Sequence, residues 1–293
     1  MNGSETLPLV ARLGVGRTVQ RVRLRRWLVS VLLVVGGFIM LLPELWVLVN
    51  SFEPSSMQFS LPPVWFTSHL TLASYRQLFS LIPFLMQLAN SVAVTVAVVV
   101  GSCVVSVLAA YAFARLQFWG RDILFVALLS GLMLPIQIAA IPEFIEVKYL
   151  GLLNSQLSLI FPALIQVFGI FLLREHFKTI PAELEEAARL EGAGELQILR
   201  LVVVPLSWPA IYATAIITAQ YIWNDFFWPN LYITSPSRMV APLGLVTLQN
   251  AYQSGPVGAI FAGLSILVIP VAVFFVFVQR QLMEGLGFAG ISR

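Results

Sequence analysis

Long apolar runs alternate with short polar stretches along almost the whole chain. A helix needs about 20 mostly apolar residues to cross a bilayer. Six runs are close to that length, and we predict a transmembrane helix for each: approximately Trp27–Val49, Leu88–Ala114, Asp122–Ile141, Gln156–Arg174, Pro205–Phe227 and Val257–Val278. The pattern therefore predicts an all-α, polytopic membrane protein with six transmembrane helices.

Proline interrupts the third and fourth of these runs, at Pro135 and Pro162. The backbone groups that a proline frees must be satisfied by neighbouring helices or water, because lipid offers no partner. We therefore expect both helices to lie inside a bundle. The first run is too long for the apolar part of a cleaved signal peptide, and no small-residue cleavage site follows it. We expect it to be retained.

The composition supports the membrane class. Of the 293 residues, 59% are apolar and 11% are charged, whereas soluble domains carry about 25% charged residues. The mean hydropathy is +0.89. The single cysteine, Cys103, lies inside an apolar run, so it forms no intrachain disulfide and indicates no metal site.

The positive charges are distributed unevenly. Most Lys and Arg residues lie in a basic leader (1–26), after the second and fourth spans, and in the tail (281–293), whereas the other side holds only Arg76, Lys148 and Arg238. The positive-inside rule then places both termini in the cytoplasm. Membrane topology and anionic lipid explain the leader's arginines, so we expect no nucleic-acid partner.

The inner loop between the fourth and fifth spans, residues 175–204, carries a short acidic segment. Pro181 suits a first helical position, and acidic residues in the following turns complement the helix dipole. Gly192 suits the left-handed position that follows a helix end. We predict a discrete helix over Pro181–Glu191.

A helix this short is marginal alone in water, so something must hold it. It can lie on the lipid headgroups or enter a groove of a cytoplasmic protein. Its polar surface displays Glu183, Glu185, Glu186 and Glu191 against a single Arg189. Anionic lipid would repel these glutamates, which favours a protein groove.

The segment Glu186-Ala-Ala-Arg-Leu-Glu-Gly-Ala193, followed by Val204-Pro205, resembles the EAA loop of permease subunits in binding-protein-dependent ABC importers. Glu191 stands where that pattern usually has Asp. Other stretches resemble the second permease of the maltose-type sugar importers: Asn90-Ser91, Ala109-Ala-Tyr-Ala-Phe-Ala-Arg115, Gly151-Leu-Leu-Asn-Ser155 and Trp223-Asn-Asp-Phe-Phe-Trp228. The tail ending Gly287-Phe-Ala-Gly-Ile departs from that family's sequence.

This resemblance implies the architecture of a type I ABC importer permease, with a permease domain over 27–280 in a bacterial plasma membrane. The acidic helix would be a coupling helix that sits in a cleft of a cytoplasmic ATPase. Matching the motif residue by residue gives Glu186, Ala187, Ala188 and Gly192 as its contacts, with Glu183 and Glu191 as further candidates.

The resemblance also implies a division of labour. A second, related permease would complete the pore, two ATPase copies would drive it, and an extracytoplasmic binding protein would deliver solute. The chain lacks a Gly-x-x-x-x-Gly-Lys-Ser/Thr segment, so we expect it to be non-catalytic and ATP and Mg²⁺ to bind to the ATPase.

Polar residues at membrane depth are candidates for the solute path, because burying them costs free energy. Amides and carboxylates suit sugar hydroxyls, and aromatic rings suit sugar faces. The candidates are Gln137, Gln166, Gln220, Tyr221, Trp223, Asn224 and Asp225. Asn224 and Asp225 have an alternative role, which is to cap a helix end or to bond the partner permease.

The function that we predict is ATP-driven import of an oligosaccharide or related glycan. An alternative cargo is glycerol phosphate or another polar solute, but the interior of the spans holds no Lys or Arg that an anion would favour. A self-powered secondary carrier is a rival from another class. It would usually show an internal repeat and ionisable residues at mid-membrane, and we find no repeat.

Overall fold

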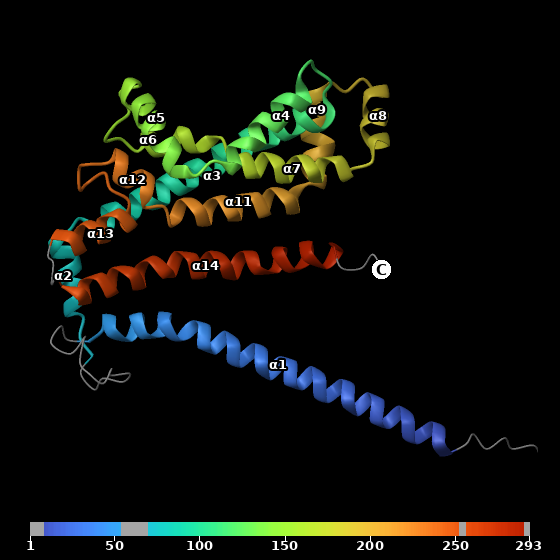
Figure 1. The fold of residues 1–293 in the computed structure, drawn as a ribbon, viewed down its shortest axis with the longest axis horizontal. Coiled ribbons are helices and arrows are strands. Elements are labelled where there is room, and N and C mark those ends of the chain that lie inside the picture. The colour runs from blue at the N-terminus through green and yellow to red at the C-terminus, as the bar shows by residue number, and fades with distance from the viewer. Residues whose placement is uncertain (1–8, 54–69, 252–255, 290–293) are drawn as a thin grey trace, which may run out of the picture.

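The computed structural model describes residues 9–53, 70–251 and 256–289, and this part of the chain contains helices and no strands (Figure 1). The helices are α1 Leu9–Ser51, α2 Ala73–Leu81, α3 Phe84–Arg115, α4 Arg121–Ser130, η1 Gly131–Met133, α5 Ile136–Tyr149, α6 Leu157–Ile160, η2 Pro162–Leu164, α7 Val167–Thr179, α8 Ala182–Leu190, α9 Glu195–Ile198, η3 Leu199–Val203, α10 Val204–Leu206, α11 Trp208–Trp223, α12 Phe227–Tyr232, α13 Ala241–Ala251 and α14 Val257–Ala289. The predicted all-α fold is confirmed.

Three helical stretches are long and apolar enough to cross a membrane without a sharp bend: Arg26–Ser51 in α1, Phe84–Arg115 in α3, and Leu157–Thr179, which runs through α6, η2 and α7. They coincide with the first, second and fourth predicted spans. The sixth predicted span corresponds to α14, where Val257–Val273 is apolar.

The third span is broken, whereas the sequence pattern predicts one run over 122–141. The stretch from α4 to η1 and the helix α5 differ in direction by 108°. The break lies at Leu134, which is extended at φ −81° and ψ 128°. Proline disfavours the helical conformation of the residue before it, so Pro135 explains the position of the break.

The fifth span is also bent, and its helical part begins before the predicted Pro205. Residues Glu195–Leu206 and Trp208–Trp223 form a helical pair that is bent by 80°. The bend falls at Ser207, with Pro209 in the first turn of α11. Proline is tolerated there because the first turn of a helix needs no donor from that residue.

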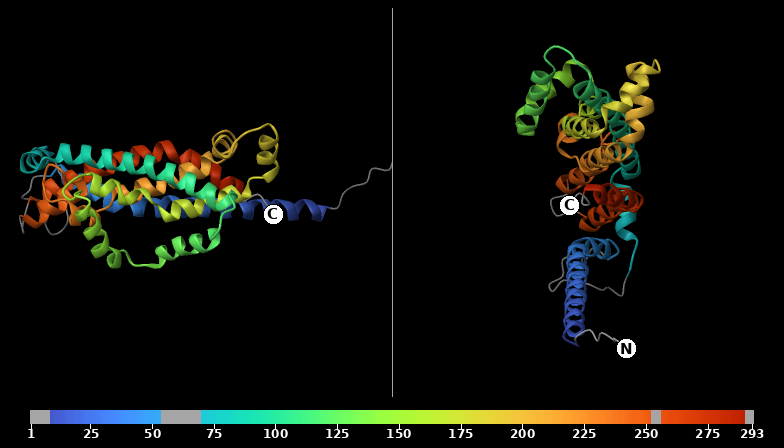
Figure 2. Two further views of the ribbon diagram at one scale, coloured as in Figure 1. Left: turned by 90° about the horizontal axis from the view of Figure 1, so that it is seen from above. Right: turned by 90° about the vertical axis from the view of Figure 1, so that its right-hand side faces the viewer.

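The broken third span stands away from the rest of the bundle (Figure 2). Phe125 is the buried residue of α4, and Val147 is that of α5. In the single chain, much of the third span is exposed, so the expectation that it lies inside a bundle stays a prediction for the assembled importer. The helices that the structure describes leave most of its apolar surface uncovered.

The centre of the bundle is formed by α3, which packs against α7 and α11. A side chain at Gly169 of α7 would meet the methyl group of Thr214 at 2.8 Å and the hydroxyl of Ser106 at 3.0 Å. Three helices thus approach closely at one point. At one end of the bundle, on the right in Figure 1, lie α8, the N-terminal end of α1 and the C-terminal end of α14.

Candidate functional site

The acidic helix forms as predicted, over Ala182–Leu190, with Pro181 as its N-cap rather than its first residue. Gly192 takes the left-handed conformation at φ +88°, which confirms that expectation. The amide of Ala193 donates to the carbonyl of Ala188, and the amide of Gly192 donates to that of Arg189. This pair of bonds satisfies helix-end carbonyls that would otherwise lack partners.

Most of the predicted coupling residues lie at the surface of α8. Glu183, Glu186, Ala187, Glu191 and Gly192 are exposed, whereas Ala188 is half-buried against the core of the bundle. The apolar side chains of Leu184 and Leu190 are also exposed, the latter to 90%. The outer surface of α8 therefore combines carboxylates with apolar groups, as a helix does when it docks in a protein groove.

Glu185 differs from its acidic neighbours because only 3% of its side chain is exposed. Its carboxylate Oε1 lies 2.7 Å from Nε of Arg115, the last residue of α3. The two atoms are not aligned as a hydrogen bond, so the contact is an attraction between charges. Arg115 also donates from Nη2 to the carbonyls of Phe177 and Ile180, at 2.8 and 2.6 Å, and so caps the end of α7.

A second carboxylate continues this network. Glu195, at the start of α9, accepts two hydrogen bonds from Arg189, at 2.9 and 3.2 Å, and one from the hydroxyl of Tyr111, at 2.6 Å. Arg189 also lies 3.6 Å from Glu185. The bond to Glu195 raises the pKa of the Arg189 guanidinium above its ordinary value. The network joins α8 to α3, α7 and α9.

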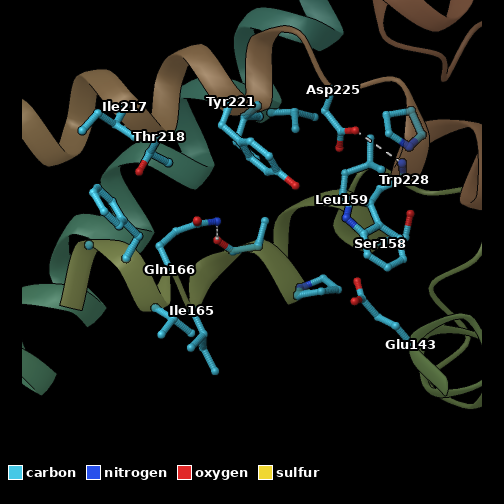
Figure 3. Close-up of a pocket in the computed structure, with 18 of the residues that line it drawn as sticks. Glu143, Ser158, Leu159, Ile165, Gln166, Ile217, Thr218, Tyr221, Asp225 and Trp228 are labelled. Carbon is cyan, nitrogen blue, oxygen red and sulfur yellow. Dashed lines mark hydrogen bonds between the residues drawn. The ribbon is translucent and has the colours of Figure 1, made fainter. Parts of the chain in front are cut away.

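A cavity of about 420 Å³ lies between α7 and α11, and the helices α6 and α12 that line it are at the opposite end of the bundle from α8 (Figure 1). The residues around it come mainly from α6, η2, α7, α11 and α12, with single residues from η1, α3 and α5. It contains three of the predicted solute-path residues: Gln166, Tyr221 and Asp225. Figure 3 shows the ring of Tyr221 between Gln166 and Asp225, with Glu143 facing them across the cavity.

The polar groups of the cavity are positioned by local bonds. The side-chain amide of Gln166 donates to the carbonyl of Ala163 at 2.9 Å. Asp225 Oδ1 accepts from the amides of Phe227 and Trp228, at 2.9 and 3.4 Å. Asp225 thus also caps the start of α12, which was the alternative role that we considered for it.

The other solute-path candidates do not line this cavity. Gln137 is exposed on the projecting α5, and Gln220 and Asn224 are exposed on and after α11. The side chain of Asn224 donates to the carbonyl of Gln220 at 2.8 Å, a bond at the end of the helix. Trp223 is buried within the fold.

Sequence reasoning missed several residues at both places. Glu143 and Trp228 line the cavity, and the hydroxyl of Tyr232 donates to Glu143 at 2.9 Å. Glu143 lies beyond the predicted end of the third span, although the helix α5 continues to Tyr149. The sequence gives no indication of the ion pair between Arg115 and Glu185, because a local pattern does not show which residues of separate helices meet.

The cavity can hold a polar, uncharged molecule. It offers carboxylates, an amide and aromatic rings, and no Lys or Arg occurs among its described lining residues. These groups accept and donate hydrogen bonds to hydroxyls and stack on apolar faces. The apolar helices around the cavity are those of a polytopic membrane protein.

Comparison with known proteins identifies the family. Residues 13–285 match the family described as binding-protein-dependent transport system inner membrane component, and the chain belongs to it. It is therefore a multi-pass permease subunit of an ABC importer, in a family of inner membrane proteins.

Two curated relatives and one solved structure extend the comparison. The arabinooligosaccharides transport system permease protein AraQ of Halalkalibacterium halodurans is 31% identical over 91% of this chain and 96% of its own length. The diacetylchitobiose uptake system permease protein NgcG of Streptomyces coelicolor is 31% identical over 86% and 84%. A bacterial ABC transporter involved in the import of the acidic polysaccharide alginate matches with a TM-score of 0.75 and 25% identity, over 88% and 96%. Together they confirm the type I permease fold.

Proposed function

We propose that this chain carries an uncharged glycan through the membrane as one half of an importer, and that a cytoplasmic ATPase drives it through α8. One observation carries the proposal: an exposed acidic helix and a polar cavity are connected by the same packed helices, α3, α7 and α11. Such an arrangement allows a movement at one end to change the access of solute at the other.

The surface of α8 supports the role of the ATPase. Glu183, Glu186 and Glu191 make no ion pair within the described residues, so their charges are available to a partner. Ala187 and Gly192 carry no large side chain that would hold a partner away. ATP and Mg²⁺ would bind to the two ATPase copies and not to this chain.

The direction of insertion follows from where α8 lies. The N-terminal end of α1 and the C-terminal end of α14 are at the α8 end of the bundle (Figure 1). The leader and the inner loops, which carry most of the Lys and Arg residues, belong to the same side of the membrane as these helix ends. The positive-inside rule makes it the cytoplasmic side, and the binding protein would then deliver its solute at the opposite end.

The second permease would cover the projecting third span. The helix is interrupted at Leu134, and backbone groups that an interruption frees from the helix find no partner in lipid. Its side chains are largely exposed, including Met133 and Ile141. A related permease that packs here would bury this apolar surface and close the path around the cavity.

The class of cargo follows from the cavity and from the relatives. The named relatives transport arabinooligosaccharides and diacetylchitobiose. The carboxylates of Glu143 and Asp225 suit hydroxyl groups and repel anions, and no cation lines the cavity among its described residues. An uncharged glycan is therefore favoured over glycerol phosphate or an acidic polysaccharide. A secondary carrier would need no exposed coupling helix.

The coupling role is tested by co-purification with candidate ATPases, comparing the wild type with Glu186→Lys. We expect the charge reversal to weaken assembly, or to separate ATP hydrolysis from uptake, while insertion into the membrane stays normal. Asp122→Lys is the matched control, since Asp122 is an exposed carboxylate at the start of α4, outside the proposed docking surface. Normal coupling in Glu186→Lys would show that the assignment is wrong.

The cargo is tested separately. The cognate binding protein is titrated with a panel of neutral oligosaccharides, an oligouronate and glycerol phosphate, and uptake into reconstituted vesicles is then measured for each ligand. We expect a neutral oligosaccharide to bind and to be transported. Transport of the oligouronate or of glycerol phosphate in preference to every neutral sugar would overturn the cargo assignment but not the coupling role.

A further inference from the structure

One contact between α8 and the rest of the bundle is buried and electrostatic. The Glu185 side chain is 3% exposed and that of Arg115 is 14% exposed, with their charged atoms 2.7 Å apart. Water screens such a pair far less than it screens a surface pair. The remaining carboxylates on α8 point outward, so Glu185 alone among them is directed at the membrane-spanning helices.

Arg115 connects three elements at once. It is the last residue of α3, it donates to two carbonyls at the end of α7, and it holds Glu185 of α8. A planar guanidinium can make these contacts together because its donors are fixed in direction. The ends of α3 and α7 and the helix α8 are thereby held in one geometry.

The same two long helices continue to the cavity. Beyond the ion pair, α3 and α7 meet α11 at Gly169, where an added Cβ would lie 2.8 Å from Thr214 and 3.0 Å from Ser106. Gly169 itself, Thr214 and the neighbouring Gln166 line the cavity. Helices packed this closely move together instead of sliding independently.

We propose that Arg115 and Glu185 are positioning residues that transmit movement of α8 to the cavity through α3 and α7. This inference rests on the proposed docking of α8 with an ATPase. The outer surface of α8 receives the ATPase, and its buried side passes the displacement on. Without the Glu185 charge, α8 can move with the ATPase while α3 and α7 keep their positions.

The test uses the assembled importer with its partner permease and ATPase, and it needs no knowledge of the solute. In a Cys103→Ser background, Ile217→Cys places a thiol in the cavity wall, where Ile217 is half-exposed. Its rate of modification by a membrane-impermeant maleimide is measured with and without Mg-ATP plus vanadate. ATPase recovery on purification and ATP hydrolysis are measured in parallel.

With the link intact, we expect nucleotide to change the modification rate by at least about fivefold. Glu185→Gln, which keeps the shape and removes the charge, should reduce this change to less than half while ATPase recovery stays normal. Glu185→Asp keeps the charge and should restore most of the response. Asp122→Asn, at an exposed pair on the same side, should behave as the wild type.

The outcomes separate the inference from the proposed function. If Glu185→Gln assembles normally and its cavity responds fully to nucleotide, the transmission role is wrong although the coupling helix stands. If Glu185→Gln loses the ATPase, Glu185 acts in assembly and the transmission role is also wrong. If the complex that keeps Glu185 shows neither ATPase recovery nor a change of maleimide modification with nucleotide, the proposed function itself fails.

Discussion

The two ends of the bundle use carboxylates in opposite ways. At the α8 end, Glu185 is buried against the guanidinium of Arg115, and Glu195 is bound by Arg189. At the cavity, Glu143 accepts a hydrogen bond from the hydroxyl of Tyr232, and Asp225 accepts from backbone amides. Neither cavity carboxylate forms an ion pair with a residue in the described part of the chain.

The difference indicates two roles for these carboxylates. A buried carboxylate that faces a guanidinium holds helices together. A carboxylate held only by neutral donors keeps lone pairs free for a ligand. The comparison predicts that breaking the buried ion pair at the α8 end reduces stability and coupling. Removing a charge at the cavity while its hydrogen bonds remain should reduce solute affinity and leave the fold intact.

The largest effect is expected from Arg115→Ala, which leaves the Glu185 charge buried without its partner. Removing one member of a buried pair costs about 3–5 kcal/mol, and two carbonyls at the end of α7 lose their donor as well. The free energy of unfolding, measured in mixed micelles with increasing denaturing detergent, should fall by about that amount.

The matched variant is the double substitution Arg115→Met with Glu185→Leu. Replacing a buried pair by apolar side chains of similar volume is often neutral for stability. The double variant should therefore be much more stable than Arg115→Ala, although its coupling should remain impaired. Equal losses in both variants would mean that the cost comes from the lost hydrogen bonds to Phe177 and Ile180, which both variants lack, and not from the unpaired charge of Glu185.

Sequence alone predicts local structure better than it predicts contacts between helices, and the two ends of the bundle show why. The helix α8 and its left-handed Gly192 depend on neighbouring residues, so Pro181, the glutamates and Gly192 were enough to predict them. The site of the third-span break is likewise local, because Pro135 restricts Leu134. The 108° angle at that break depends on packing, and no local pattern contains it.

The tertiary contacts of both sites were beyond sequence reasoning. Arg115 and Glu185 are ordinary residues in separate helices until the fold brings them within 2.7 Å. Choosing polar residues at membrane depth correctly identified Gln166, Tyr221 and Asp225 as residues that line the cavity. The same criterion also selected Gln137 and Asn224, which are exposed and do not line it. Depth along a span can be read from hydropathy, whereas the direction of each side chain depends on how bent helices pack.

A cavity charge should have the next largest effect. Asp225→Asn keeps an oxygen that can cap α12 but removes the negative charge. Hydrogen bonds to charged groups contribute about 1.5–3 kcal/mol, so the concentration of glycan needed for half-maximal uptake should rise roughly 10- to 100-fold. Uptake by reconstituted vesicles, with the glycan that the binding protein selects, measures this change.

Asp225→Ala distinguishes the two roles of this residue. It removes the cap as well as the charge, and loss of an N-cap costs about 1 kcal/mol. We expect Asp225→Ala to reduce both stability and uptake, and Asp225→Asn to reduce uptake alone. If Asp225→Asn transports normally while Asp225→Ala is destabilised, Asp225 serves only as a cap and is no part of the solute path.

Gly169→Ala tests the region that connects the two ends. The added methyl group would meet Thr214 and Ser106 at distances that require the helices to shift. Overpacking of this kind costs about 1–3 kcal/mol, partly offset by the better helix propensity of Ala. Gly37→Ala in α1 is the control, because nothing lies within 4 Å of its added atom. Denaturing detergent should unfold Gly169→Ala first, and an unchanged midpoint would mean that the three helices have room to slide.

The smallest effect is expected from Asp122→Asn, which removes an ion pair at the same end of the bundle as Glu185. The atoms of Asp122 and Arg121 are 3.0 Å apart, close to the distance in the buried pair, but the Asp122 side chain is 73% exposed. Water and salt screen an exposed pair, and such pairs contribute little. The unfolding midpoint should match that of the wild type at low and at high salt. A loss comparable to that of Arg115→Ala would mean that proximity to α8, and not burial, makes a charge at this end important.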